Sequence, residues 1–231
     1  MKAHHTGLRH GLTLIEVLVV IAILIILAGL IGPPPPSATA KANQITCLNN
    51  LKNMGLALRV FAADHGDEFP MALSLTNGGT REWLSDETRL WRHWRVLSNE
   101  LGSVRFLLCP SDSERQLPSS FMDKRPVLTR DQFTNNSHLS YFLALNPRPD
   151  EPQSILAGDR NLTTNGVPFG PGRLTLSSEL LIGFTTKPHK QAGNIVLADG
   201  SVRPALSPQF NDAWTAARTN SRGATNVWLV P

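Results

Sequence analysis

The sequence lacks the short motifs that commonly identify an enzyme. Gly-x-Ser-x-Gly, Gly-x-Gly-x-x-Gly, a phosphate-binding loop and His-Glu-x-x-His are all missing. The His and Asp residues that are present are scattered, as in any chain of 231 residues, and do not by themselves indicate a catalytic site. We therefore expect that the protein is not an enzyme.

Charge is also sparse and evenly distributed. Charged residues make up 17% of the chain, and the net charge of +4 includes no long run of Lys and Arg that could follow a phosphate backbone. Residues 41–231 carry 20 basic and 17 acidic side chains, which gives them a net charge of only +3. We therefore expect no nucleic-acid partner. Because hydrophobic residues reach 41%, most of the chain can form a folded core.

The longest hydrophobic run lies close to the N-terminus. Residues 1–11 are polar and basic, and the next 21 residues, 12–32, contain a single charged side chain, Glu16. As an α-helix this run is about 31 Å long, close to the thickness of the hydrocarbon core of a bilayer. Basic residues of the leader precede it, and none follows before Lys41. The positive-inside rule therefore predicts a transmembrane helix with a cytoplasmic leader and an extracytoplasmic remainder.

Three interpretations of this segment are compatible with its hydrophobicity. A removable secretory signal would end at the small-residue site Ala38-Thr39-Ala40, but the apolar stretch 17–32 is longer than the core of such signals. A plain signal anchor explains the length but gives Glu16 no role, and a carboxylate in a bilayer helix is costly and usually functional. The third interpretation assigns Glu16 a role.

The residues Gly11-Leu12-Thr13-Leu14-Ile15-Glu16 resemble the processing site of type IV prepilins and type II secretion pseudopilins. The resemblance implies cleavage after Gly11 by a prepilin peptidase/methyltransferase, N-methylation of Leu12, and pairing of Glu16 with the amino terminus of a neighbouring subunit. The family commonly has Phe as its first mature residue and Pro at mature position 22, where this chain has Leu12 and Pro33. The implied partners are that enzyme, other pilin-like subunits and the bacterial inner membrane.

The physical chemistry of the segment agrees with that role for Glu16. Cleavage after Gly11 creates a Leu12 α-amine that is charged at neutral pH and lies at the membrane edge. Glu16 is one helical turn further along and could neutralise such an amine, on its own chain or on a neighbour.

The remaining sequence predicts an α+β domain. Four consecutive prolines begin the run 33–40, which predicts a Pro-rich spacer between the membrane segment and the head, 41–231. Within the head, apolar residues at three- and four-residue steps predict helices over 41–63 and 86–101, and a short helix is expected near 212–218. The predicted strands are 104–109, 138–145, 154–157, 174–184 and 226–230, with a hairpin over 194–203 that turns at Asp199-Gly200. We expect a pilin-like fold in which helices come first and a mainly antiparallel sheet follows.

The chain has two cysteines, Cys47 and Cys109. In an extracytoplasmic head an even pair can form a disulfide, which would join the first head helix to the loop at Cys109-Pro110. Two buried free thiols are the alternative, and a thiol count under denaturing, non-reducing conditions distinguishes the two. Neither cysteine has a second one at metal-ligand spacing, so the spacing predicts no cysteine metal site.

His189, Asp199 and Gly200 resemble the H-x9-DG element found near the C-terminus of a subgroup of prepilin-like proteins. Further fragments resemble patterns common in that subgroup: 47–58, 63–70, 109–112 and 155–161. Asp199-Gly200 is also explained by the geometry of a tight turn, and His189 by packing beside Pro188, so a purely structural role for the element stays open.

Calcium is a candidate cofactor, because the heads of major pseudopilins can bind it through loop carboxylates and carbonyl groups. Asp64, Asp67, Asp159 and Asp199 have suitable side chains, but no Asp-x-Asp-x-Asp-Gly loop is present and the sequence defines no ligand set. No other cofactor is expected.

These features predict a pseudopilin-like structural subunit of the inner membrane, with a periplasmic or extracellular head, that is assembled into a type II secretion or type IV pilus-like filament. Two alternatives remain. One is a membrane-anchored extracytoplasmic binding protein that never polymerises, for which crosslinking would find only monomers. The other is a soluble domain released after Ala40, for which the mature chain would start at Lys41.

Overall fold

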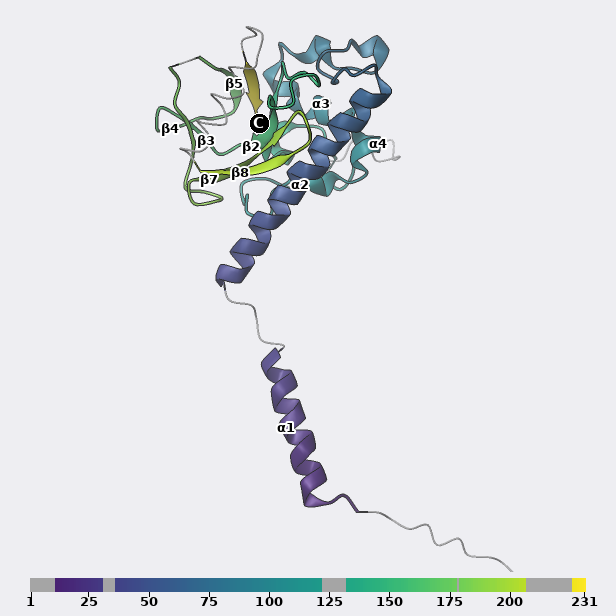
Figure 1. Cartoon of the computed structure of the whole chain (residues 1–231), viewed down its shortest axis with the longest axis vertical. Helices are drawn as coiled ribbons and strands as arrows, with labels where there is room; N and C mark the ends of the chain where they lie inside the picture. The colour runs from purple at the N-terminus through teal and green to yellow at the C-terminus, as the bar shows by residue number, and fades with distance from the viewer. Residues whose placement is uncertain (1–10, 31–35, 122–131, 178, 207–225) are drawn as a thin grey trace, which may run out of the picture. The chain divides into compact units, whose positions relative to one another are not determined.

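The N-terminal part of the chain forms a unit of its own. The computed structural model describes residues 11–30, 36–121, 132–177, 179–206 and 226–231, and the chain divides into two compact units, residues 1–39 and 40–231 (Figure 1). The first unit contains α1, Leu14–Leu30, whose 17 residues carry one charge, Glu16 in the first turn. Among the described residues, no helix combines the length and the apolar character needed to cross a membrane.

The helix α2, Pro36–Asp64, begins inside the segment predicted to be a Pro-rich spacer. Residues 36–40 are helical, so the predicted start at residue 41 was five residues too late, while 33–35 lie outside the described residues. Proline is tolerated in the first turn of a helix because the first N–H groups have no intrahelical acceptor. Ala38 and Ala40 then favour the helical conformation.

The described residues of the head form a six-stranded and a three-stranded sheet, and the strand pairs within these sheets are antiparallel. The strand order of the large sheet is β5-β9-β1-β2-β7-β8, and that of the small sheet is β4-β3-β6. The strands are β1 Tyr141–Ala144, β2 Ile155–Asp159, β3 Leu162–Thr164, β4 Val167–Pro168, β5 Gly172–Thr175, β6 Ile182–Phe184, β7 Ala192–Leu197, β8 Val202–Leu206 and β9 Val227–Val230.

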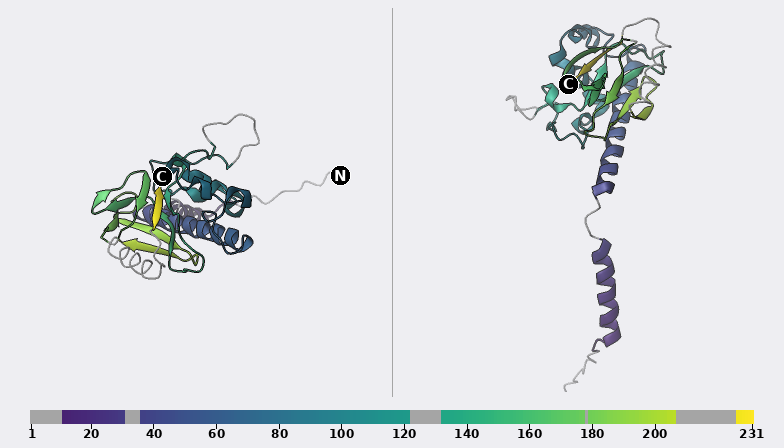
Figure 2. Two further views of the ribbon diagram at one scale, coloured as in Figure 1. Left: turned by 90° about the horizontal axis from the view of Figure 1, so that it is seen from above. Right: turned by 90° about the vertical axis from the view of Figure 1, so that its left-hand side faces the viewer.

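Both faces of the large sheet are covered, so it forms the middle layer of the head (Figure 2). In β1, Tyr141 and Leu143 belong to one apolar cluster, whereas Phe142 and Ala144 belong to another, as the alternation of side chains along a strand requires. The first cluster includes a stripe of α2 at three- and four-residue steps: Cys47, Leu51, Met54, Leu58 and Phe61. The second includes the small-sheet residues Leu162, Ile182 and Phe184.

The helix α2 lies very close to the sheet at Gly55. A Cβ atom built on this glycine would lie 2.4 Å from Cγ2 of Val196 in β7, which is far inside van der Waals contact. Glycine therefore allows the helix backbone and the strand to approach each other at this point. The contact fixes α2 along β7, and this strand separates the two parts of the H-x9-DG element.

The α+β prediction is confirmed, with helices before a mainly antiparallel sheet. Strands near 138–145, 154–157 and 226–230 are present as β1, β2 and β9, and the predicted hairpin is β7–β8. The predicted strand 174–184 is instead two strands, β5 and β6, which belong to different sheets. The short helix predicted near 212–218 lies outside the described residues.

The region before β1 consists of short helices rather than one long helix and a strand. The predicted helix 86–101 is broken into η3 Glu87–Arg89, α3 Leu90–Arg95 and α4 Ser98–Leu101. The predicted strand 104–109 is wrong: it is the 3-10 helix η4, Val104–Leu107, whose first turn is capped because the Ser103 side chain accepts the N–H of Arg105. The remaining 3-10 helices are η1 Leu75–Asn77, η2 Arg81–Trp83 and η5 Asn136–His138.

Candidate functional site

The residues predicted to be processed lie at the start of α1. Oε2 of Glu16 accepts hydrogen bonds from the backbone N–H and from Oγ1 of Thr13, both at 2.7 Å. Because Thr13 is the residue before the helix and Glu16 is the third helical residue, this is the arrangement of a capping box. The Glu16 carboxylate therefore lies at the N-terminal end of α1, where it contacts Thr13, the residue that follows Leu12.

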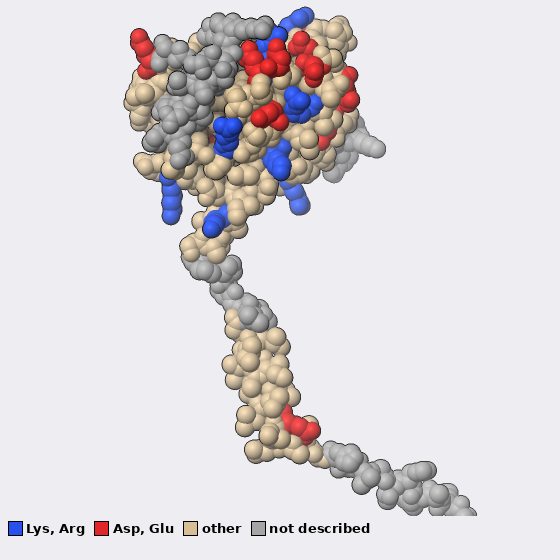
Figure 3. Space-filling model, in the orientation of Figure 1, with Lys and Arg blue, Asp and Glu red and all other residues tan. Residues whose placement is uncertain are grey.

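The surface of α1 outside this first turn carries no charge. In the space-filling view the helix is free of Lys, Arg, Asp and Glu except for acidic atoms near its start, where the sequence has Glu16 (Figure 3). The large apolar side chains from Leu12 to Leu27 are exposed within this unit. The segment thus offers an apolar helical surface with a single carboxylate at one end.

The two cysteines are joined in the head. Cys47 of α2 and Cys109, which follows η4, form a disulfide with a Cα–Cα distance of 5.0 Å. The structure therefore contains the predicted disulfide and not two free thiols. Both residues are buried. One turn further along α2, Nδ2 of Asn50 donates a hydrogen bond to the carbonyl oxygen of Leu108 at 2.8 Å. A covalent bond and a hydrogen bond therefore hold the same loop on the same helix face.

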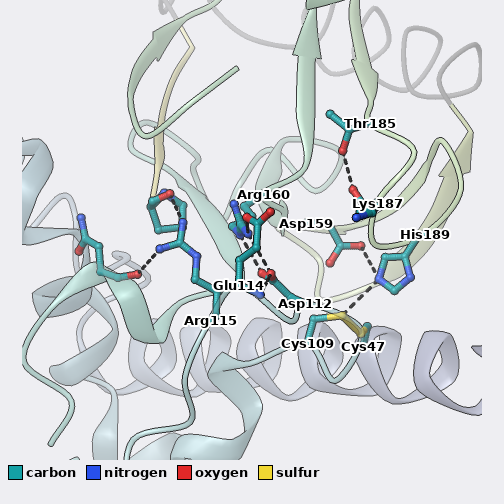
Figure 4. Close-up of polar contacts among 12 residues, drawn as sticks. Cys47, Cys109, Asp112, Glu114, Arg115, Asp159, Arg160, Thr185, Lys187 and His189 are labelled. Atoms are coloured by element: carbon teal, nitrogen blue, oxygen red, sulfur yellow. Dashed lines mark hydrogen bonds and ion pairs between the residues drawn. A yellow bond between two sulfur atoms is a disulfide. The ribbon is translucent and has the colours of Figure 1, made fainter. Parts of the chain in front are cut away.

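His189 lies against this disulfide (Figure 4). Its Nε2 is 3.3 Å from Sγ of Cys109 and 3.8 Å from Oδ2 of Asp159. A disulfide sulfur carries no proton, so the imidazole N–H must be the donor in the contact with Cys109. The distance to Asp159 is too long for a hydrogen bond. The structure thus brings a buried imidazole and a buried carboxylate to one side of the disulfide.

Asp159, the last residue of β2, is held by Asn194 of β7. Oδ2 accepts the backbone N–H and the Nδ2 of Asn194 at 2.7 and 2.9 Å, whereas Oδ1 has no hydrogen-bond partner among the described residues. Burial raises the pKa of Asp159 to about 7, against the two hydrogen bonds from Asn194, which lower it. Burial also lowers the pKa of His189, so its ring is neutral at neutral pH.

The next residue, Arg160, connects two of the fragments that resemble the prepilin-like subgroup. Nε and one terminal nitrogen of Arg160 donate to the two carboxylate oxygens of Asp112 at 2.7 and 2.8 Å, and the same terminal nitrogen contacts Glu114. Burial alone would raise the pKa of Asp112, but the hydrogen bonds and charge of Arg160 outweigh it and hold this pKa below its usual value. A cavity of about 430 Å³ lies here, lined by Asp112, Arg160 and Pro188 among others.

The structure separates the two parts of the H-x9-DG element. His189 precedes β7 and contacts the disulfide, whereas Asp199 and Gly200 form the turn after β7. Oδ1 of Asp199 accepts the N–H of Ser201 at 2.8 Å, and Gly200 has a φ of 83°, which glycine adopts without strain. The six residues of β7 place about 20 Å between the two parts, so they do not form one site.

The potential metal ligands are distributed differently from the sequence expectation. Within the described residues, Asp64, Asp67, Asp159 and Asp199, the acids considered for calcium, do not form a group of three neighbouring ligands. The group that does form is Cys47, Cys109 and His189, whose ligand atoms all lie within 4.8 Å of one another. Residue spacing along the chain gave no indication of it, because the three residues come from distant segments.

Asn194 and Arg160 were not predicted as site residues. Asn194 lies in an apolar strand run, where its one unusual feature is that it is polar at a buried position. Arg160 directly follows a buried strand and belongs to a fragment noted for its resemblance, 155–161, but its partner lies 48 residues away. Only a long-range contact reveals the role of either residue.

Comparison with known proteins identifies the N-terminal segment. Residues 8–32 match the family model of the prokaryotic N-terminal methylation motif. This match supports a prepilin- or pseudopilin-type protein that is processed at its N-terminus, and it implies processing by a prepilin peptidase and pilin-like subunits as partners. It also suggests membrane anchoring. The match does not extend to the H-x9-DG element, and no curated protein and no solved structure matches the chain.

Proposed function

We propose that this chain is a pseudopilin-like structural subunit, cleaved after Gly11 and assembled through its N-terminal helix into a type II secretion or type IV pilus-like filament. The match of residues 8–32 to the methylation motif carries the proposal. The proposal gives the head no catalytic step. It places the leader in the cytoplasm, the segment 12–32 in the inner membrane and the head in the periplasm or outside the cell.

The local structure at Glu16 supports the assembly step. In the uncleaved chain its carboxylate is occupied by the N–H and hydroxyl group of Thr13. Cleavage adds a charged α-amine at Leu12, next to Thr13 and at the same end of the helix. A charged amine is a stronger partner for a carboxylate than a neutral donor. The carboxylate can therefore exchange Thr13 for the amine of a neighbouring subunit and set the register between the two helices.

The disulfide agrees with the proposed location of the head. Disulfides form and persist in oxidising compartments such as the periplasm and the cell surface. The Cys47–Cys109 bond is buried in the head, and it would be formed after the head has left the cytoplasm.

Mass spectrometry of the mature N-terminus is the first test. A peptide that starts at Leu12 and is heavier by one methyl group is the expected result for membrane-extracted protein. A mature chain that starts at Met1 would leave a plain anchor, and one that starts at Lys41 would indicate a secreted soluble domain. Either of these results would contradict the proposal.

The variant Glu16→Val tests the assembly step separately. It should still be inserted and cleaved, but it should assemble poorly with wild-type neighbours because its helix has no carboxylate for their amines. Thr13→Val is the matched control, since it removes the hydroxyl partner of Glu16 and keeps the carboxylate, and it should assemble normally. The amount of filament should be measured after shearing, and contacts between subunits should be measured by crosslinking. Normal assembly of Glu16→Val would exclude the proposed pairing. If the wild-type protein itself is found only as a monomer after crosslinking, the result would favour a membrane-anchored binding protein that does not polymerise.

A further inference from the structure

The disulfide and His189 place three potential metal ligands in one buried group, and the Asp159 carboxylate lies next to that group. The sulfur atoms of Cys47 and Cys109 and a ring nitrogen of His189 lie within 4.8 Å of one another. Oδ2 of Asp159 is 3.8 Å from Nε2 of His189. Thiolate sulfur, imidazole nitrogen and carboxylate oxygen are all ligand types that zinc takes. As long as the sulfurs are bonded to each other, they cannot act as thiolate ligands.

One ligand–ligand distance already suits a tetrahedral ion. Zinc bonds of about 2.0–2.3 Å give distances of roughly 3.3–3.8 Å between neighbouring ligand atoms. The distance from Sγ of Cys109 to Nε2 of His189 is 3.3 Å. The Asp159 carboxylate lies beside the same nitrogen through Oδ2, at 3.8 Å, and its other oxygen, Oδ1, would be the ligand. The two sulfurs would have to move from bonding distance to about 3.8 Å, which breaking of the disulfide permits.

One oxygen of the Asp159 carboxylate is hydrogen-bonded, and the other has no partner among the described residues. Asn194 donates two hydrogen bonds to Oδ2 of Asp159, which fixes the orientation of the group in the way that outer-sphere partners fix metal ligands. Oδ1 is buried and has no hydrogen-bond partner among the described residues. A buried acceptor without a partner is costly, and a cation bound at this position would remove that cost.

We propose that reduction of the Cys47–Cys109 disulfide converts this cluster into a buried zinc site, with both cysteines, His189 and Asp159 as its ligands. A thiol or phosphine reductant supplies two electrons, the Sγ–Sγ bond breaks, and each sulfur takes up one proton. Binding of Zn²⁺ then releases these two protons as the thiols become thiolates, together with the proton of those Asp159 side chains that are protonated. The oxidised head is held by a covalent bond, and the reduced head by the metal ion.

A cavity of about 430 Å³ is lined by residues that lie next to two of the ligands in the sequence. Its lining includes Ser111, close to Cys109, and Pro188, which precedes His189. Two thiolates, one carboxylate and Zn²⁺ leave a net charge of about −1, with the imidazole neutral. The inference does not depend on filament assembly, because it concerns the head alone.

Cobalt substitution is the direct test. The full-length protein in detergent should be reduced with a phosphine, the two thiols counted, and Co²⁺ added without oxygen. The expected result is a one-to-one complex with the strong visible bands of tetrahedral cobalt and with thiolate charge-transfer bands, and Zn²⁺ should displace the cobalt. The oxidised protein should show neither set of bands. A reduced protein without these bands would overturn the proposal.

Two variants separate this site from binding by the cysteine pair alone. His189→Ala should weaken binding by at least about 100-fold, and Asp159→Asn by roughly 10- to 100-fold with altered visible bands. His138→Ala removes another buried histidine and should bind Co²⁺ as wild type does. Equal affinity of His189→Ala and wild type would overturn the assignment. Far-UV circular dichroism covers the case in which the reduced protein unfolds: metal should restore the fold, and failure to do so would also contradict the proposal.

Discussion

The start of α1 and the cluster around the disulfide show two ways of holding a carboxylate in place. Glu16 is exposed within its unit and is held by Thr13, three residues away in the sequence. Asp159 is buried and is held by Asn194, which is 35 residues away, beside a histidine and a disulfide from still other segments. The first arrangement is complete within one helical turn, whereas the second exists only in the folded head.

This difference explains which region can be identified by comparison with known proteins. The N-terminal motif is a local sequence pattern, and residues 8–32 match the model of the prokaryotic N-terminal methylation motif. The head cluster has no local pattern, because its members lie on α2, in the loop after η4, at the end of β2 and before β7. If the distinction holds, changes in the head should alter its stability without changing N-terminal processing.

The largest effect is expected from removal of the disulfide. Cys47→Ser together with Cys109→Ser should lower the free energy of unfolding of the head by about 4 kcal/mol, because the bond closes a loop of 62 residues. Urea unfolding followed by tryptophan fluorescence measures the loss, since all five tryptophans belong to the head. Cleavage after Gly11 should be unchanged in the same variant. Loss of cleavage would show that N-terminal processing depends on the stability of the head.

The next effect is an acid sensitivity that depends on tertiary burial. Burial lowers the pKa of His93 in α3 from 6.5 to about 4. Between these values the unfolded chain binds more protons than the folded one, so the free energy of unfolding falls as the pH falls from about 6.5 to 4. The contribution at the acid end is on the order of 3 kcal/mol. His93→Gln should flatten the dependence of thermal stability on pH over this range. An unchanged slope in His93→Gln would show that the burial of His93 does not cause the acid sensitivity.

The smallest effects compare two partners of one guanidinium group. Arg160→Met should cost about 2 kcal/mol, because it leaves the Asp112 carboxylate, whose side chain is 5% exposed, without its charged donor. Glu114→Gln should cost less than about 0.5 kcal/mol, because the side chain of Glu114 is 73% exposed and solvent screens its ion pair. Both values can be measured by urea unfolding. Equal costs would show that burial does not set the strength of these pairs.

Much of the fold could be predicted from local patterns, and the failures have physical causes. Apolar residues at three- and four-residue steps predicted the helix 41–63, which lies within α2, and the Asp199-Gly200 turn predicted the β7–β8 hairpin. The predicted strand 104–109 failed because a Ser103 cap and burial of Val104 and Leu107 favour a 3-10 turn. Strand 174–184 failed because one apolar run supplies strands to two sheets, and only packing decides where such a run divides.

The sequence by itself determined the features that depend on neighbours within one or two helical turns. These are the motif from Gly11 to Glu16, the apolar helix that follows it and the tight turn at Asp199-Gly200. Tertiary structure decided that Cys47 meets Cys109, that His189 joins them while Asp199 lies at the other end of β7, and that Asp112 meets Arg160. The reason is range: a turn or a capping box is encoded by adjacent residues, whereas a buried cluster forms only when the layers that carry its members pack together.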